Sequence, residues 1–414
     1  MKKCSIVIGS LWGDEGKGHM TDILCNEKNT LNIRFNGGSQ ASHTVVTPDN
    51  KRHSFHHFGA GTFTGAKTYL SEDFIVNPIS FVFELNELFD SFKIKPHVFV
   101  NPNAIVTTPW DMYLNQGIET YRDNQRHGSC GYGINETVER SRIEKYKITV
   151  MDLFSEENLI NKLLLIQNEY IKQRLEQEYN LTISDLDIKY QRLLNDQENI
   201  SMFLFYVSQF LSNIQIVQDN ILNRFDNIVF EGAQGLLLDQ NNTEYYPHVT
   251  TSNTGIKNVM DILASLSYIG PIDIYYMSRC YITKHGAGAF KGELKEKPYS
   301  NIEDLTNIPN EFQGSLRFGY MDFDLLAYEI NKDLRNLKLP AKINITFTCL
   351  DQLDDDFKYL LDGKKHCQKS DLFVDTAFNI LKQKIDNLSD IYATNGLTRH
   401  NFIKYTKMWL MYKT

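Results

Sequence analysis

Long apolar runs, paired cysteines and an excess of positive charge are all missing from this sequence of 414 residues. No apolar run reaches the roughly 18 residues that a membrane-spanning helix needs. Met1-Lys2-Lys3 leads into a strand and a glycine-rich loop, and not into the apolar core of a signal peptide. We therefore expect a cytoplasmic protein without a membrane partner.

The six cysteines are scattered and show no C-x-x-C spacing, so they predict isolated thiols and argue against a zinc site or a disulfide framework. The net charge is −8 and the pI is about 5.8, which argues against a broad surface for nucleic acid. The hydrophobic content of 42% is typical of a globular protein with a sizeable core. At this length the chain forms either one large α/β domain or two to three smaller ones.

The most informative stretch that is present is Ile6-Val-Ile-Gly-Ser-Leu-Trp-Gly-Asp-Glu-Gly-Lys-Gly18. Its β-branched start predicts a buried strand, its four glycines predict a loop, and the helical spacing from Met20 to Cys25 predicts the start of a helix. Such a loop directs backbone N–H groups and a helix N-terminus toward an anion, and Lys17 adds a positive charge. The pattern therefore predicts a phosphate-binding loop.

This loop differs from the Walker A loop. Six residues separate Gly9 from Gly16, and Gly18 replaces the hydroxyl residue that would hold magnesium. Asp14 and Glu15 are poor neighbours for a phosphate unless a metal ion or a proton transfer accounts for them. The loop is thus expected to combine phosphate binding with either a metal ion or a proton transfer.

Strands alternate with helices along the rest of the chain, and polar loops follow the carboxyl ends of the strands. This order predicts an α/β fold with a mostly parallel central sheet, flanked by helices, whose loops form one crevice. Residues 154–222 carry apolar side chains every three to four positions and predict a helical insertion. The predicted strands after the first cover residues 31–35, 98–106, 227–230, 275–282 and 343–350.

Five motifs, taken in order, resemble those of adenylosuccinate synthetase. They are Trp12-Gly-Asp-Glu-Gly-Lys-Gly18, Gly37-Gly-x-x-Ala-x-His-Thr44, Glu231-Gly-Ala-Gln-Gly235, Tyr246-Pro-x-Val-Thr250 with Ser252-Asn-Thr254, and Gly286-Ala-Gly288. The resemblance covers nearly the whole chain. It implies a P-loop-NTPase-like fold, with residues 1–414 as a single domain, 154–222 as a helical subdomain within it, and a homodimer.

The resemblance also implies an activity. The family joins the amino group of aspartate to C6 of IMP, with GTP as co-substrate and Mg²⁺ as cofactor, and gives adenylosuccinate, GDP and phosphate in purine biosynthesis. The partners expected from it are a purine nucleoside monophosphate, GTP and an amino acid that donates its amine.

The resemblance assigns roles to residues of this chain. Asp14 would remove the N1 proton, His43 would stabilise the transferred phosphoryl group, and Lys17 would neutralise the GTP phosphates. Asp14 and the carbonyl of Ser42 would be the Mg²⁺ ligands. The implied GTP contacts are Gly13, Glu15, Gly16, Lys17, Gly18, Asp351, Asn395 and Gly396, and the implied IMP contacts are Gln40, Cys130, Arg140, Gln234 and Thr250.

The chain departs from the family pattern at several of these positions. Gln40 replaces an asparagine, Cys130 replaces a phosphate-binding threonine, and Cys349 replaces a lysine near the guanine-reading Asp351. The arginine that a partner subunit lends in the family has no direct counterpart here. Arg140 or Arg142 is the candidate to replace it.

The largest departure lies where the amine donor should bind. The family carries several arginines there, which suit the two carboxylates of aspartate. This chain has Asn310-Glu-Phe-Gln-Gly-Ser-Leu-Arg-Phe-Gly319, which leaves Ser315 and a single arginine, Arg317, as candidate donor contacts. One arginine can clamp one carboxylate with two hydrogen bonds.

Two other functions stay open at this point. A relative of the family could act on another purine nucleotide, such as (d)GMP to give 2-aminoadenylosuccinate, or on an amine other than aspartate. The retained Asp14 favours a 6-oxopurine such as IMP. The second alternative is a nucleotide-binding protein without catalysis, which the joint presence of Asp14, Lys17, His43 and Gln234 disfavours.

Overall fold

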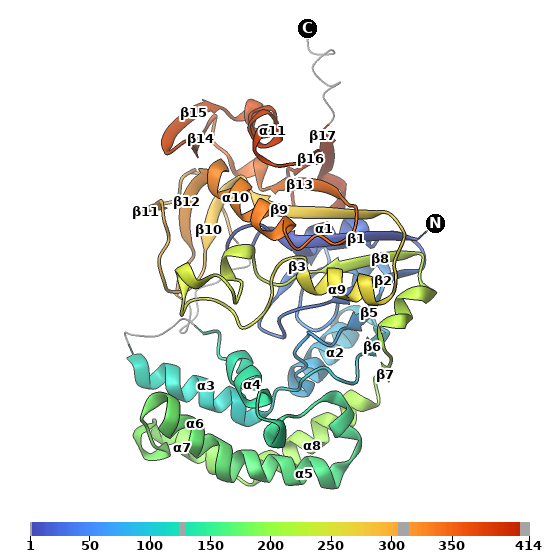
Figure 1. The fold of residues 1–414 in the computed structure, drawn as a ribbon, viewed down its shortest axis with the longest axis vertical. Coiled ribbons are helices and arrows are strands. Elements are labelled where there is room, and N and C mark those ends of the chain that lie inside the picture. Colours follow the sequence, from blue (N-terminus) through green and yellow to red (C-terminus); the bar gives the residue numbers. More distant parts are fainter. Residues whose placement is uncertain (1, 124–128, 305–313, 406–414) are drawn as a thin grey trace.

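The computed structural model describes residues 2–123, 129–304 and 314–405. A ten-stranded sheet runs through its centre (Figure 1) and confirms the predicted mostly parallel sheet, because only the pairing of β17 with β16 at one edge is antiparallel. In spatial order its strands are β17 (Phe402–Tyr405), β16 (Leu388–Thr394), β13 (Lys342–Thr348), β9 (Ile272–Arg279), β1 (Lys3–Gly9), β8 (Asn227–Glu231), β2 (Thr30–Arg34), β5 (Lys67–Leu70), β6 (Val98–Val100) and β7 (Ile214–Ile216).

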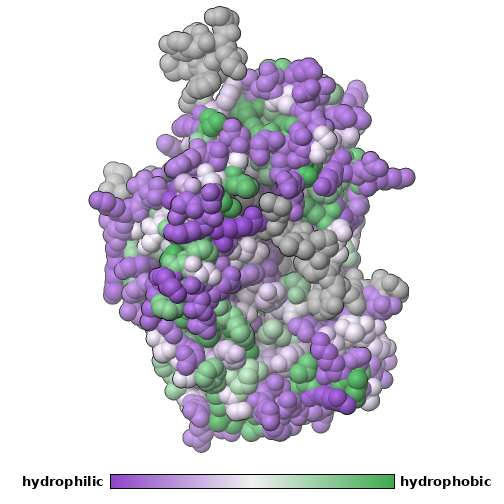
Figure 2. Space-filling view, turned by 180° about the vertical axis from the view of Figure 1, so that it is seen from behind, coloured by the Kyte–Doolittle hydropathy of each residue, from purple (hydrophilic) through white to green (hydrophobic). Residues whose placement is uncertain are grey.

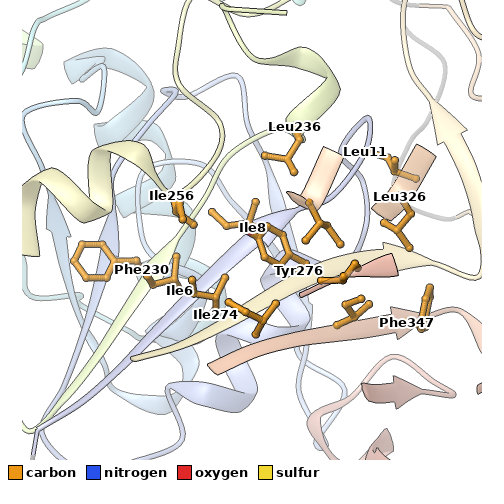
Figure 3. Packing of buried hydrophobic residues seen from close by; sticks show 14 of the residues in the cluster. Ile6, Ile8, Leu11, Phe230, Leu236, Ile256, Ile274, Tyr276, Leu326 and Phe347 are labelled. Atoms are coloured by element: carbon orange, nitrogen blue, oxygen red, sulfur yellow. The ribbon is translucent and has the colours of Figure 1, made fainter. Parts of the chain in front are cut away.

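β1 lies in the middle of this sheet and buries both of its faces. Ile6 and Ile8 pack into the main hydrophobic core on one face, and Val7 packs on the other against Met20 of α1 (Lys17–Leu24). Figure 3 shows Ile6 and Ile8 among side chains from neighbouring strands and helices. Burying an isoleucine side chain stabilises a fold by about 1.5–3 kcal/mol. The position of the loop after β1 is therefore fixed by strongly stabilised structure.

The strand predicted over residues 275–282 is two strands. β9 ends at Arg279, and β10 (Tyr281–Lys284) leaves the central sheet to pair with β12 (Arg317–Asp322) in a second sheet. The remaining strands of that sheet are β11 (Glu293–Leu294), β14 (Asp356–Leu361) and β15 (Lys364–Lys369), and a hairpin is formed by β3 (His43–Val46) and β4 (Arg52–Phe55). Sequence periodicity missed the break because both strands are buried almost throughout, with only Asp273 partly exposed.

The helices gather in groups around the sheet (Figure 1), with α3 to α8 at one end of the molecule. Their bounds are α2 (Pro78–Phe92), α3 (Pro109–Arg122), α4 (Ile134–Ser141), α5 (Glu156–Leu165), α6 (Ile171–Arg174), α7 (Ile188–Asn195), α8 (Glu198–Leu211), α9 (Lys257–Ser265), α10 (Phe323–Leu334) and α11 (Phe373–Lys384). Residues 154–222 are largely helical, as predicted. Their core is shared with α2 and α3, for example where the rings of Phe81 and Phe210 lie 4.9 Å apart, so a separate subdomain stays a prediction.

The outer surface agrees with the composition. Figure 2 shows a mostly hydrophilic face on which apolar residues form small separate groups. Within the described ranges no helix has both the length and the apolar character needed to cross a bilayer. All six cysteines are free thiols, which confirms the prediction from their spacing.

Candidate active site

Loops that follow the carboxyl ends of the central strands line one large cavity of about 1120 Å³. Parallel strands end at the same edge of a sheet, so the loops after β1, β2, β8, β9, β13 and β16 meet there. Pockets for a single small-molecule ligand measure about 300–1,000 Å³, so this cavity lies above that range and suits more than one ligand. Its wall includes the following residues predicted from the sequence: Gly13, Asp14, Glu15, Gly16, Lys17, Gly18, Gln40, Ser42, His43, Cys130, Gln234, Thr250, Asp351 and Gly396.

At the base of the phosphate loop, Gly9 lies close to Glu15 and to Lys17 at the start of α1. A Cβ atom on Gly9 would lie 2.4 Å from the backbone oxygen of Gln234, 2.5 Å from Oε2 of Glu15 and 3.0 Å from Nζ of Lys17. Only glycine allows this approach. Oε1 of Glu15 accepts a hydrogen bond from the N–H of Leu11 at 2.7 Å, so Glu15 ties the loop together from within.

Burial shifts the pKa values of the two charged side chains next to Gly9, those of Glu15 and Lys17, in opposite directions. It raises the pKa of Glu15 and lowers the pKa of Lys17, while their mutual attraction opposes both shifts. Both side chains are almost fully buried. An anion in the cavity would favour the charged form of Lys17, because it replaces part of the solvation that burial removes.

Asp14 adopts a left-handed backbone conformation, with φ of 56°. For a residue with a side chain this conformation costs on the order of 1–2 kcal/mol, and such strain is common at functional sites. Nε of Arg279 donates a hydrogen bond to the carbonyl oxygen of Asp14 at 2.6 Å, which holds the loop in this shape. The sequence analysis missed Arg279, although a charged residue at the end of a buried strand is a usable signal.

His43 and Glu231 form a buried pair beside the phosphate loop. Nδ1 of His43 lies 2.5 Å from Oε1 of Glu231, and Oε2 of Glu231 accepts a hydrogen bond from the N–H of Ala60 at 3.0 Å. Burial, opposed by Glu231, lowers the pKa of His43 to about 4. The neutral ring therefore donates from Nδ1 to the carboxylate, and Nε2 is left for a ligand.

The same pair is close to the N-terminus of α1, since a Cβ on Gly18 would lie 2.9 Å from Cβ of His43. An anion held by the N-terminal N–H groups of α1 would thus be next to the imidazole. Glu231 belongs to a motif quoted above, but the sequence analysis did not assign it to the site.

Uncharged polar groups form another part of the wall. Both the oxygen and the nitrogen of the Gln40 amide are buried and have no hydrogen-bond partner within the described part of the chain. Buried polar groups are normally paired, so this amide is suited to a polar ligand. Gln234 has a left-handed backbone, with φ of 65°. Burial raises the pKa of Cys130 to about 11, so its thiol is a neutral wall group at pH 7.

The loop after β13 joins the phosphate loop. Oγ1 of Thr348 donates to the carbonyl oxygen of Glu15 at 3.3 Å, and Cys349, with φ of 63°, turns the chain into Asp351 on the cavity wall. Gly396 lines the same region, while Asn395 stands just outside the wall and its N–H bonds the carbonyl of Asn401 at 3.3 Å. Asp351 therefore belongs to the wall of the cavity that the phosphate loop also lines.

Arg140 does not fit its predicted role. Its side chain is fully buried and binds both oxygens of Asp111, from Nε at 2.8 Å and from Nη2 at 2.9 Å. It also donates to the carbonyls of Tyr146 and Val106. Because the Arg140 guanidinium makes all of these hydrogen bonds in the interior, it cannot reach a ligand or a second subunit. Arg142 is 63% exposed and lines the cavity, so it is the remaining candidate.

Arg317 is also committed within the chain, contrary to the predicted clamp. Its Nε donates to Oε1 of Glu293 at 2.7 Å, its Nη2 donates to Oε2 of Glu293, and its Nη1 donates to the carbonyls of Gly286 and Gly288 at 3.1 and 2.8 Å. Four of its five N–H groups are used. Neither Arg317 nor the exposed Ser315 is part of the cavity wall, and residues 310–313 lie outside the described ranges.

The oxygen donors on the wall suit magnesium. Within the described residues no three His, Cys, Asp or Glu side chains are grouped so that they could hold a metal ion by themselves. Mg²⁺ usually binds one or two carboxylates and completes its shell with water and phosphate oxygens. Asp14 and the exposed Ser42 line the cavity, and this sparse set fits a magnesium ion that arrives with a nucleotide.

Known proteins with similar sequences are adenylosuccinate synthetases. The enzyme of that name from Thermoplasma volcanium is 29% identical over 375 residues, which cover 88% of this chain and 80% of the relative. The one from a Psychrobacter species is 29% identical over 366 residues, which cover 86% and 78%.

Two solved structures share the fold. The fully ligated adenylosuccinate synthetase from Plasmodium falciparum covers 97% of this chain and 99% of its own, with a TM-score of 0.71 and 18% identity. The succinoaminodeoxyadenylate synthetase of cyanophage S-2L, bound to dGMP and to dATP as an energy donor, covers 99% and 98%, with a TM-score of 0.58 and 12% identity.

A family model gives the clearest relation, because it matches most of the chain without a break. It is the model of adenylosuccinate synthetase, and it matches residues 6–369, from β1 through β15. All of the loops described above except the one after β16 fall within this range. The chain therefore belongs to the adenylosuccinate synthetase family.

Proposed function

We propose that this protein is a GTP-dependent C–N ligase that joins L-aspartate to C6 of IMP and releases adenylosuccinate, GDP and phosphate. One observation carries the proposal: Asp14 and His43, the latter held by the buried Glu231, line the same cavity as the phosphate loop. In this proposal one cavity holds a base, a group that stabilises phosphoryl transfer and an anion site. Membership of the family supports the same reaction.

The first chemical step is the transfer of a phosphoryl group. The oxygen on C6 of IMP is a poor leaving group, so it has to be phosphorylated before an amine can displace it. Asp14 accepts the N1 proton of IMP, and negative charge builds on O6, which attacks the γ-phosphorus of GTP. Nε2 of His43 and the N–H groups at the start of α1 stabilise the transferred group, and GDP leaves.

The second step is the displacement of the phosphate. The amine of aspartate attacks C6, the C6–O bond breaks, and phosphate departs toward the same N–H groups and His43. The proton that the amine loses is taken up by the departing phosphate. Glu231 orients the ring of His43 and favours its protonation as negative charge approaches. Mg²⁺, bound with the nucleotide by Asp14 and Ser42, would neutralise phosphate charge. Gln40, Gln234, Thr250 and Cys130 are the proposed contacts of IMP.

The reaction can be tested by measuring phosphate release from GTP. We expect release only when IMP and aspartate are both present, together with formation of adenylosuccinate detected by mass spectrometry. Replacing IMP by dGMP tests the alternative nucleotide substrate, and replacing aspartate by other amino acids tests the donor. Binding of GTP without release under any combination would instead support a non-catalytic nucleotide-binding protein.

Asp351 is the proposed reader of guanine, because a carboxylate can accept both N1–H and the exocyclic N2–H, which adenine does not offer. Asp351→Asn is expected to raise KM for GTP by about 10–100-fold, since a hydrogen bond to a charged group contributes about 1.5–3 kcal/mol. The preference for GTP over ATP should fall with it. Asp355→Asn is a matched control, because Asp355 is exposed and lies outside the cavity wall. Equal use of ATP and GTP by the unmodified protein would refute this role.

The proposal also covers the oligomeric state and the cellular location of the protein. We expect a homodimer. Arg142 is the proposed contact of a nucleotide phosphate, in place of the buried Arg140. We also expect the protein to work in the cytoplasm, where its nucleotide substrates are found. Sedimentation with and without IMP and GTP tests the dimer.

A further inference from the structure

Lys284 and Arg317 face each other across the antiparallel pair of β10 and β12. Although they are neighbours, their surroundings differ. Lys284 lines the cavity together with Gly286 and Ala287, whereas Arg317 is outside the wall. Of this pair, only the lysine, which is 2% exposed, belongs to the cavity wall.

Arg317 is held away from the cavity by Glu293 of β11. Its fork already binds both oxygens of this carboxylate, which occupies the arginine as a substrate carboxylate would. A bound donor would have to break this ion pair to use Arg317. The sequence offers no substitute nearby, because residues 298–316 contain no lysine or arginine.

Lys284 is held firmly at its place in the wall. Its Nζ lies 4.8 Å from the ring centre of Trp12 and donates to the carbonyl of Ala287. The Trp12 ring is in turn packed edge-on against Tyr245 at 4.6 Å and Phe290 at 6.3 Å. Trp12 precedes Gly13 and Asp14, so the ammonium group is fixed next to the loop that carries the proposed base.

The charge of Lys284 is poorly solvated. Burial and the neighbouring Arg317 lower its pKa to about 8, while Glu293 opposes the shift. At pH 7 the ammonium is thus still mostly protonated, and an anion brought into the cavity would stabilise it. This favours a role in binding a negatively charged group.

We propose that Lys284 is the residue that binds a carboxylate of the amine donor, in place of Arg317. This inference rests on the proposed ligase function and names the donor as an amino acid held through one carboxylate by one lysine. A lysine is a point charge and not a planar fork. Discrimination between carboxylates of different geometry is therefore expected to be weaker than with an arginine clamp.

The kinetic test uses Lys284→Gln and Lys284→Arg in the full-length protein. We expect Lys284→Gln to raise KM for aspartate by about 10–100-fold, as for loss of a charge-assisted hydrogen bond, with KM for IMP and GTP changed by less than about threefold. Lys284→Arg keeps the charge and should recover most of the affinity. Lys295→Gln removes the same charge from an exposed position outside the wall and should change none of the three constants.

A binding test separates this proposal from the ligase function. Calorimetry measures the Kd of aspartate in the presence of IMP and a non-hydrolysable GTP analogue, and melting temperatures check that each variant is folded. Aspartate binding that depends on Lys284, in a protein that releases no phosphate, would contradict the ligase function but not the role of Lys284. An unchanged KM and Kd in folded Lys284→Gln, an effect of Arg317→Gln instead, or no aspartate binding by the unmodified protein would overturn the role of Lys284.

Discussion

Asp14→Asn is expected to lower kcat by about 10²–10⁴-fold, the range by which a positioned general base accelerates a reaction. Asparagine keeps the shape of the side chain and tolerates the left-handed backbone at this position. The carboxylate that is proposed to accept the N1 proton is lost, together with one proposed ligand of Mg²⁺. The phosphate loop itself does not depend on this side chain, because Glu15 and Arg279 hold it through backbone atoms.

The measurement is phosphate release under saturating GTP, IMP and aspartate, accompanied by the Kd for GTP with excess Mg²⁺. We expect the Kd to change by less than about tenfold while turnover collapses. Asp90→Asn, on the exposed side of α2 and outside the cavity, is the control for a charge change of the same kind. Turnover of Asp14→Asn within about threefold of the unmodified protein would exclude Asp14 as the base.

Loss of the His43–Glu231 pair is expected to have the second large effect. His43→Gln removes the group proposed to stabilise the phosphoryl transfer and should lower kcat by about 10²–10³-fold, as the loss of one oxyanion-stabilising group does. Glu231→Gln leaves the imidazole in place but removes its partner charge, so a smaller loss of about 10–100-fold is expected, the range reported for second-layer partners of functional histidines. Its unfolding temperature should fall as well, because a nearby buried guanidinium, Arg34, loses the carboxylate that attracts it.

The double variant shows whether the two residues act as a unit. If Glu231 works through His43, the double variant should be no slower than His43→Gln alone, because the effects of coupled residues do not add. Multiplied losses would mean that Glu231 acts independently, for example by orienting the loop around Ala60. Pre-steady-state measurements of GDP formation, which accompanies the first step, and of phosphate release, which follows the second, resolve the step that is slowed.

Local sequence signals were sufficient to predict the strand, the loop and the helix start that form the framework of the site. The β-branched run at residues 6–8 is buried on both faces and can only be an inner strand of a covered sheet. A strand, a glycine-rich loop and a helix start in this order place Lys17 and Asp14 at the sheet edge. Because parallel strands end together, the loops carrying His43, Gln234 and Asp351 had to meet them there.

The partners of charged side chains were beyond the reach of the sequence. Arg140 and Arg142 stand two residues apart on one short helix and its end, yet one is fully buried against Asp111 and the other is exposed. Helical periodicity predicts that they point in different directions, but not which one meets an acid that is 29 residues away. Only the packing of α4 against α3 decides it.

The sequence by itself determined that this chain has a mostly parallel sheet with a glycine-rich loop at its edge, and which residues stand in that loop, because strand burial and glycine spacing act over a few residues. Tertiary structure alone decided which of the paired Lys284 and Arg317 lies on the cavity wall. The break between β9 and β10 brings Lys284 opposite Arg317, and Glu293 then binds the arginine while Trp12 fixes the lysine in the cavity wall. These contacts join residues far apart in the chain, and their strength depends on burial and distance, which no local pattern encodes.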